Sequence, residues 1–157
     1  MLNHRGPEFG QILRRVTDGI NWVFGTSSDV LSFTTSGTGG LEAAVVNVLS
    51  PGDRVLSVSI GSFGDRLATI AETYGAEVER YAVEWGGVAD PAEIGRRLDA
   101  DPSLKAVLVT HNETSTGVTN DLEAISRVVK GRGKLLLVDA ISSLGAIDLP
   151  VDQWKCD

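Results

Sequence analysis

Residues 106–139 read AVLVTHNETSTGVTNDLEAISRVVKGRGKLLLVD and combine two short apolar runs with a helical pattern between them. The runs Ala106–Thr110 and Leu135–Asp139 have the length and composition of buried strands. Between them, Leu122, Ile125 and Val129 recur at the spacing of one helix face. Parallel strands need a crossover connection such as a helix, whereas antiparallel strands can be joined by a short turn. Two strands joined through a helix are therefore expected to lie parallel in one sheet. The stretch therefore predicts a β-α-β unit and an α/β fold with a mainly parallel sheet flanked by helices.

The rest of the chain repeats this alternation. Further runs with strand composition are Val30–Thr34, Arg54–Ser59 and Glu77–Val83. Apolar stripes at helical spacing lie between the strands, formed by Leu41, Val45, Val48 and Leu49 and by Leu67, Ile70, Ala71 and Tyr74. A longer stripe precedes every strand and comprises Phe9, Ile12, Leu13, Val16, Ile20, Val23 and Phe24, with Gly25 placed to end it. We therefore predict a first helix followed by five strands with helices between them.

Short polar motifs mark where some of these elements begin. The pair Asp90 and Glu93 predicts a helix that starts with a capping box, with a proline in its first turn. The pair Asn120 and Glu123 repeats the scheme before the next helix. The tetrapeptide SPGD at residues 50–53 predicts a turn between a helix and the strand that follows.

Composition and charge narrow the classes of function. A chain of 157 residues fits one domain, and 22% charged residues is the balance of a soluble globular protein. The net charge of -7 argues against nucleic acid, which needs a basic surface. With no run of ~18 apolar residues and no leader pattern, we expect a cytoplasmic protein without membrane contact. Cys156 is the only cysteine, which excludes an internal disulfide and gives no zinc pattern.

The loop after the first predicted strand suits a phosphate group. In an open parallel sheet, ligands bind where loops leave the carboxyl ends of the strands. Residues 35–40 read TSGTGG and lead into a helix, so glycines, hydroxyls and the free N–H groups of a helix start lie together. Ser36, Gly37 and Thr38 are therefore candidate phosphate ligands, and the spacing fits neither a dinucleotide nor a nucleoside-triphosphate loop. An ordinary helix cap is the alternative.

Three further predicted strands end in residues that suit a ligand. Phe63 lies between glycines after Arg54–Ser59, and the polar loop His111–Gly117 follows Ala106–Thr110. Asp139 ends a strongly apolar strand, where a buried carboxylate is costly unless it is paired. A protonated pyridine nitrogen would supply that pairing, and the contact would keep the ring an electron sink. The alternatives are a packing role for Phe63 and a turn cap for Asp139.

Four segments together resemble the class V aminotransferases of fold type I, which depend on pyridoxal phosphate, in particular their alanine-glyoxylate and serine-glyoxylate branch. The segments are NHRGPEF at 3–9, SGTGGLEAA at 36–44, HNETSTG at 111–117 and VDAISSLG at 138–145. Each is a weak signal alone, but their order and separation cover nearly the whole chain. The resemblance implies that residues 1–157 form part of the large cofactor-binding domain and that the small C-terminal domain is absent.

The resemblance also implies roles around pyridoxal 5'-phosphate. The three phosphate candidates would hold the phosphate group, and Phe63 would stack on the pyridine ring, where the family often has tryptophan or tyrosine. Thr114 would hydrogen-bond the ring hydroxyl, Asp139 would pair with the ring nitrogen, and Ile141 would pack on the opposite face of the ring.

In this family a lysine holds the cofactor as a Schiff base, and we expect that lysine beyond Asp157. Lys105 and Lys134 stand where strands begin, which is the wrong edge of the sheet. Lys130 ends a helix that leads back to the same edge, and Lys155 lies in a stretch that matches the residues before the family's missing strand. No catalytic residue is therefore assigned within this chain.

The resemblance implies that the parent enzyme transfers an amino group from a small amino acid, alanine or serine, to an oxo acid such as glyoxylate or pyruvate, and that it is a homodimer. Two alternatives stay open. One is a non-catalytic fragment that binds phosphate-bearing ligands, and the other is a different class V enzyme, either 2-aminoethylphosphonate transaminase or cysteine desulfurase. Phe63 disfavours the desulfurase, which usually has histidine there. We expect His111 to order its loop.

Overall fold

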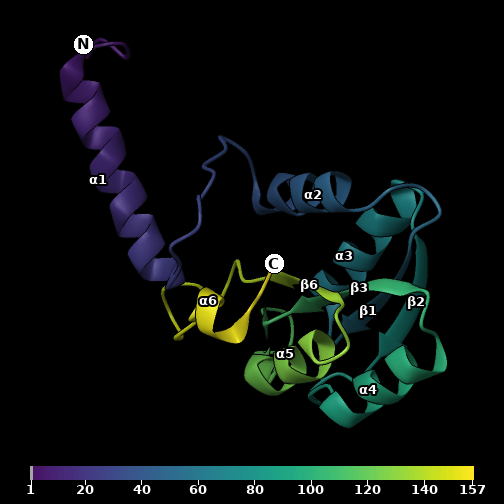
Figure 1. Ribbon diagram of the computed structural model, residues 1–157. Coiled ribbons are helices and arrows are strands. Elements are labelled where there is room, and N and C mark those ends of the chain that lie inside the picture. The colour runs from purple at the N-terminus through teal and green to yellow at the C-terminus, as the bar shows by residue number, and fades with distance from the viewer. Residues whose placement is uncertain (1) are drawn as a thin grey trace.

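The computed structural model describes residues 2–157 and contains a four-stranded sheet in which every neighbouring pair is parallel (Figure 1). The strand order is β2-β1-β3-β6, with β1 Arg54–Ser59, β2 Glu77–Ala82, β3 Leu104–Thr110 and β6 Leu135–Asp139. A separate antiparallel pair consists of β4 Asn112–Glu113 and β5 Val118–Thr119. The helices are α1 Pro7–Phe24, α2 Gly37–Val48, α3 Ser62–Thr73, α4 Pro91–Ala100, α5 Leu122–Lys130 and α6 Val151–Trp154. The predicted fold class is confirmed.

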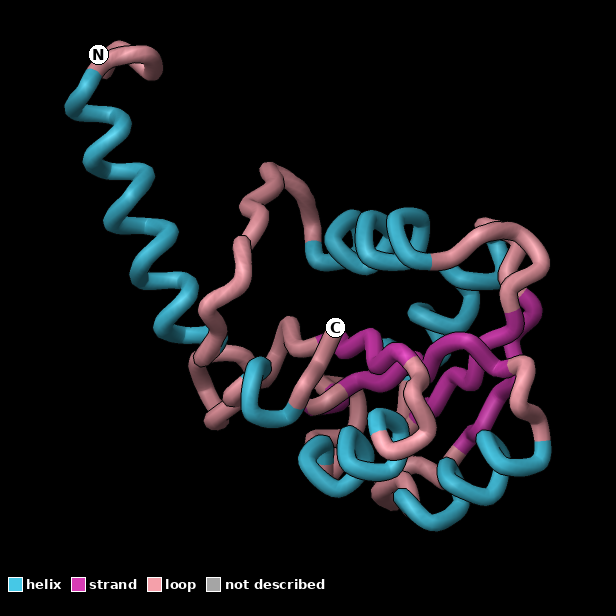
Figure 2. The backbone as a smooth tube through the Cα atoms, in the orientation of Figure 1, coloured by secondary structure: helices cyan, strands magenta, loops and turns pink. Residues whose placement is uncertain are grey.

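Helices cover the sheet on both faces (Figure 2). In the central strand β3, Val107 and Val109 belong to one apolar cluster, with residues of α4 and α5. Ala106 and Leu108 belong to the other cluster, with residues of α2 and α3. Successive side chains of a strand point to opposite faces, so a strand covered on both sides must be apolar throughout. This is why β3 and β6 are continuous apolar runs.

Four of the five predicted strands are present, and the prediction of a strand at Val30–Thr34 is wrong. Val30–Thr34 is irregular, although its composition suits a strand. The segment runs from α1 to α2 away from the sheet (Figure 1), and Leu31 and Phe33 are 74% and 64% exposed. A strand requires a neighbour to take its N–H and C=O groups. No such neighbour lies beside this segment within residues 2–157.

The first helix forms as predicted but does not join the core. It ends at Gly25, which adopts the left-handed conformation that favours glycine. The apolar face of α1 remains exposed, since Phe9, Leu13 and Val16 are 37%, 53% and 46% accessible. Directly after α1 in the sequence, Thr26 and Ser27 are bound by Asp152. The Asp152 carboxylate accepts hydrogen bonds from both hydroxyls and from the Ser27 N–H group. A hollow of about 520 Å³ lies between the end of α1 and residues 145–153.

One predicted helix cap is confirmed and one is displaced by a residue. Asp90 caps α4 by accepting a hydrogen bond from the Ala92 N–H group at 2.9 Å. The cap of α5 is Asp121, whose side chain accepts from the Ala124 N–H group, and not Asn120. Asn120 is buried, and its amide instead links the Ala89 N–H group to the Thr110 carbonyl. In neither pair does the glutamate reach back to the cap, because Glu93 and Glu123 pair with arginines.

No helix among the described residues is both long and apolar enough to cross a membrane.

Replacing Leu108 with alanine should lower the free energy of unfolding by about 3 kcal/mol, because Leu108 is fully buried between the sheet and its helices. Leu31→Ala is the matched control, and we expect a change within about 0.5 kcal/mol at that exposed site. Urea unfolding followed by circular dichroism measures both values. A large loss for Leu31→Ala would contradict the placement of residues 30–34 outside the core.

Candidate functional site at the carboxyl edge of the sheet

Three strands deliver polar residues to one edge of the sheet. Thr110 at the end of β3 is in register with Asp139 at the end of β6, and β1 ends at Ser59 beside them. The loops that follow are tied together, because the Ser142 hydroxyl donates to the backbone carbonyl and the side-chain oxygen of Asn112, at 2.7 and 2.9 Å. The carboxyl ends of β1, β3 and β6 therefore lie side by side at one edge of the sheet, where the sequence places the candidate ligand-binding residues.

The start of α2 reaches this edge without a strand before it. Ser36 caps the helix, and its hydroxyl accepts a hydrogen bond from the Gly39 N–H group at 3.4 Å. Gly37 lies directly against Ile141, so closely that a Cβ atom on Gly37 would overlap the end of that side chain. The predicted phosphate candidates are therefore brought to the loop after β6. The helix-cap interpretation of the TSGTGG motif is confirmed. Phosphate binding stays a prediction, because a helix cap also leaves free N–H groups for an anion.

Phe63 lies in the first turn of α3 and is partly buried. The guanidinium carbon of Arg66 is 4.9 Å from the centre of its ring, and Arg66 also donates to the Thr38 hydroxyl at 3.5 Å. Arg66 thus places a positive charge between Phe63, the candidate for contact with the cofactor ring, and Thr38, a candidate phosphate ligand. The sequence reasoning did not single it out, although its position three residues after Phe63 puts both on one helix face.

Thr114 lies between β4 and β5 with an exposed side chain. Its two neighbours both contact the start of α3. Glu113 is fully buried and accepts hydrogen bonds from the first turn of α3, and the Ser115 hydroxyl accepts from the Ser62 N–H group. Glu113 was missed as a site residue, because in the sequence it reads as one more polar residue of the loop His111–Gly117.

Asp139 is 4% exposed and has no basic side chain within ion-pair distance in the described part of the chain. Its Oδ1 atom accepts a hydrogen bond from the Ile141 N–H group at 3.0 Å, so it does cap the turn. Burial raises the pKa of the Asp139 carboxyl, the Ile141 hydrogen bond lowers it, and the nearby charge of Glu113 raises it. A cationic group placed here would remove the cost of the buried charge.

The lysines lie where the sequence predicts, away from Asp139. Lys105 binds Asp53 at 2.6 Å and the Val48 carbonyl at 2.8 Å, and Lys134 binds the Pro102 carbonyl at 2.7 Å, where β3 and β6 begin. Lys130 ends α5 and pairs with Asp157, and Lys155 follows α6. None of the four therefore stands at the carboxyl edge.

His111 is buried and Cys156 is partly buried. The His111 ring nitrogen Nδ1 lies 3.0 Å from the Ser143 hydroxyl, and burial lowers the pKa of the imidazole. The contact fixes the loop after β3 to the loop after β6, in agreement with the ordering role expected. Burial raises the pKa of the Cys156 thiol to about 11, which makes it a poor nucleophile at neutral pH. Among residues 2–157, no cluster of histidine, cysteine and acidic side chains suits a metal ion.

The structure is a parallel α/β domain with a helix start and a buried carboxylate that has no ion-pair partner at one edge of its sheet. The chain belongs to the class-V aminotransferase family, described as Aminotransferase class-V, which it matches over residues 1–157. The predicted family is confirmed.

The chain is also similar to individual proteins that carry different names. It is 48% identical over 160 residues to the soluble hydrogenase small subunit of a Synechococcus species, covering 99% of this chain and 41% of that protein. It is 38% identical over 161 residues to the L-aspartate–glyoxylate aminotransferase of Paracoccus denitrificans, with the same two coverages of 99% and 41%. The crystal structure of alanine–glyoxylate aminotransferase from a Nostoc species superposes with a TM-score of 0.93 at 32% identity, over 99% of this chain and 41% of that one. The chain thus spans about two-fifths of the length of these relatives.

Asp139→Asn should raise the melting temperature of the chain without added ligand at pH 7. Because the pKa of the Asp139 carboxyl is raised, the folded protein favours the protonated form. The contribution of this group to the free energy of unfolding is fully present below the unfolded pKa of about 3.9 and is lost as pH rises through the folded pKa. An uncharged isostere avoids that loss, and we expect a gain of a few degrees, corresponding to about 1 kcal/mol.

Thermal unfolding of both proteins between pH 4 and pH 8 measures this effect, and the difference should shrink toward pH 4. The exposed Asp148→Asn is the control, with an expected change within about 0.5 kcal/mol. A lower melting temperature for Asp139→Asn at pH 7 would contradict an uncompensated charge at this position.

Proposed function

We propose that this chain is the pyridoxal-phosphate-binding part of an aminotransferase. The observation that carries the proposal is the pairing of two opposite electrostatic needs at one edge of the sheet. The start of α2 favours an anion, while the buried Asp139 needs a cation. Their loops touch through Gly37 and Ile141. A ligand with a phosphate at one end and a protonated ring nitrogen at the other satisfies both needs.

The described residues fit this cofactor. Ser36, Gly37 and Thr38 would hold the phosphate group, with the charge of Arg66 close to Thr38. Phe63 and Ile141 offer apolar surface for the two faces of the ring, and Ile141 is 61% exposed without a ligand. Thr114 would hydrogen-bond the ring hydroxyl, as the family resemblance implies. Each role is a proposal for a residue that lies at this edge or in the loops bordering it.

Asp139 would set the electronic state of the cofactor. When bound, the pyridinium ring supplies an electron sink for the carbon that loses a proton during amino transfer. The Asp139 carboxylate would hold a proton on the ring nitrogen, and its burial would keep water from weakening that contact. Asp139→Asn, which should stabilise the chain without ligand, should therefore weaken the cofactor contact, a trade-off common at functional sites.

The whole protein's reaction is part of the same proposal. We propose amino transfer from a small amino acid such as alanine or serine to an oxo acid such as glyoxylate or pyruvate, in a cytoplasmic homodimer. Support comes from the similar proteins that carry glyoxylate aminotransferase names. The proposal assigns residues 1–157 to the large domain, and it assigns the cofactor-binding lysine and the small domain to a longer protein of which this chain is part.

The position of the lysines favours a second candidate for the chain by itself. Since none of the four stands at the carboxyl edge, residues 2–157 would bind the cofactor or another phosphate-bearing ligand without turnover. Borohydride treatment with pyridoxal phosphate separates the possibilities, because a single lysine-dependent adduct would count against a non-catalytic chain. Scattered or absent adducts would support it.

Cofactor binding is best tested with pyridoxamine 5'-phosphate, which carries an amine and cannot form adducts with lysines. Ser36→Asp keeps a good helix cap but adds a negative charge where the phosphate would lie, and Ser36→Asn keeps the cap without the charge. We expect Ser36→Asp to weaken binding about tenfold and Ser36→Asn to weaken it less than about threefold. Calorimetric titration measures both. Equal affinities for the two variants, or no binding by the unmodified chain, would overturn the proposed site.

A further inference from the structure

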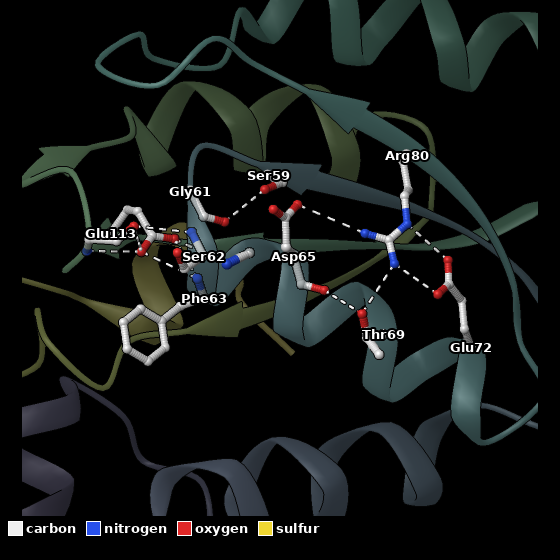
Figure 3. Close-up of polar contacts among 11 residues, drawn as sticks. Ser59, Gly61, Ser62, Phe63, Asp65, Thr69, Glu72, Arg80 and Glu113 are labelled. Carbon is white, nitrogen blue, oxygen red and sulfur yellow. Dashed lines mark hydrogen bonds and ion pairs between the residues drawn. The ribbon is translucent and has the colours of Figure 1, made fainter.

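Glu113 has an unusual environment for a carboxylate. It is 0% exposed, and within residues 2–157 no lysine, arginine or histidine lies within ion-pair distance of it. Its oxygens instead accept hydrogen bonds from the first turn of α3 and from Ser115 of its own loop (Figure 3). Oε2 accepts from the Phe63 and Gly64 N–H groups, both at 3.1 Å, and Oε1 accepts from the Ser115 N–H group and hydroxyl at 3.1 and 2.7 Å.

Glu113 replaces the cap that α3 lacks. The residue before the helix is Gly61, which has no side chain to bind the free N–H groups of the first turn. Glu113 takes the N–H groups of Phe63 and Gly64, and the Ser115 hydroxyl takes that of Ser62 at 3.0 Å. The fit requires glycine at 61, because a Cβ there would lie 2.6 Å from Cγ of Glu113. The positive end of the helix dipole also stabilises the carboxylate.

The same contact links two candidate ligands of the cofactor ring. Phe63 carries one of the bound N–H groups, and Thr114 is the residue between Glu113 and Ser115, which are both fixed on α3. Neither Phe63 nor Thr114 has a side-chain hydrogen bond of its own that would hold it in place. The relative position of the Phe63 ring and the Thr114 hydroxyl therefore depends on the bonds that Glu113 and its partner Ser115 make to the first turn of α3.

We propose that Glu113 is a positioning residue that holds Phe63 and Thr114 in the arrangement that binds the cofactor ring. The inference rests on the proposed function, because it takes these two residues as ring contacts. It separates the site into two parts: the phosphate part at the start of α2, which Glu113 does not touch, and the ring part, which depends on Glu113.

Glu113→Gln is a sharp test because a glutamine side chain has nearly the same shape as glutamate but offers different hydrogen-bonding groups. An amide has one acceptor oxygen and one NH2 group that only donates. In either orientation of the amide, its NH2 group would face another donor, either the Ser115 N–H group or the N–H groups of Phe63 and Gly64. The hydrogen bonds on that side of residue 113 would therefore be lost. The body of α3 should stay folded. Leu67, Ile70 and Ala71 pack in the core, and Arg80 of β2 binds Glu72 at 2.8 Å and Thr69 at 3.3 Å (Figure 3).

The experiment compares two ligands on the full 157-residue chain by nuclear magnetic resonance. Backbone signals of Gly37 and Thr38 report binding of inorganic phosphate and of pyridoxamine 5'-phosphate, and the amide protons of Phe63 and Gly64 report the Glu113 contact. We expect Glu113→Gln to weaken pyridoxamine phosphate about tenfold, to change inorganic phosphate by less than about twofold, and to move both amide protons upfield. Glu93→Gln, which removes a carboxylate from α4 on the other face of the sheet, is the control and should change neither affinity.

The outcomes separate the two proposals. If the unmodified chain does not bind pyridoxamine phosphate, the proposed function fails, and the amide shifts alone then show whether Glu113 fixes Phe63. If it binds and Glu113→Gln binds equally well, the proposed function stands and the positioning role is overturned. Equal weakening of both ligands together with a lower melting temperature would also overturn the positioning role, since it would show a general structural contribution.

Discussion

Strand β3 has no free face and no free edge, and that constraint shapes the rest of the domain. β1 and β6 pair with its two sides, and helices cover both of its faces. Every residue from Ala106 to Thr110 is consequently buried. Polar side chains that could contact a ligand are therefore confined to the ends of such a strand. At the carboxyl end of β3, the polar loop His111–Gly117 follows directly. The same packing that excludes function from the sheet concentrates it in the loops beyond.

Two buried carboxylates at this edge are stabilised to very different degrees. Glu113 receives hydrogen bonds from α3 and Ser115 that satisfy both of its oxygens, whereas Asp139 receives a single recorded bond, from the Ile141 N–H group. The difference accounts for their separate roles. A carboxylate surrounded by donors is a structural anchor, while one left short of partners at the mouth of a site favours an incoming cation. The charge of Glu113 also adds to the cost of charging Asp139, since it contributes to the raised pKa of the Asp139 carboxyl.

Much of this architecture could be predicted from the sequence, because it follows from local periodicity. Strands β1 and β6 have the predicted bounds, and Gly25 ends the first helix as predicted. The placement of Phe63, Thr114 and Asp139 at or just after the carboxyl ends of strands follows from the predicted strand ends alone. Glu113 and Arg66 could not be assigned in this way, since each acts on a segment far away in the sequence. Asn120 shows the same limit: its spacing suits a cap, but tertiary contacts bury it and leave the cap to Asp121.

The error at Val30–Thr34 has a different origin, because there the composition is right and the partner is missing. Strand propensity describes how well a side chain fits a pleated surface, but the backbone hydrogen bonds must come from a neighbouring strand. Within residues 2–157, no strand pairs with the outer edge of β6, where Leu136 instead exchanges hydrogen bonds with Asp157. Similarly, the apolar face of α1 is exposed. These three segments share one property: their sequences are suited to contacts that the described residues do not supply. The described residues thus supply the contacts of the central sheet and of the loops at its carboxyl edge, while the peripheral segments keep apolar patterns that these residues leave exposed.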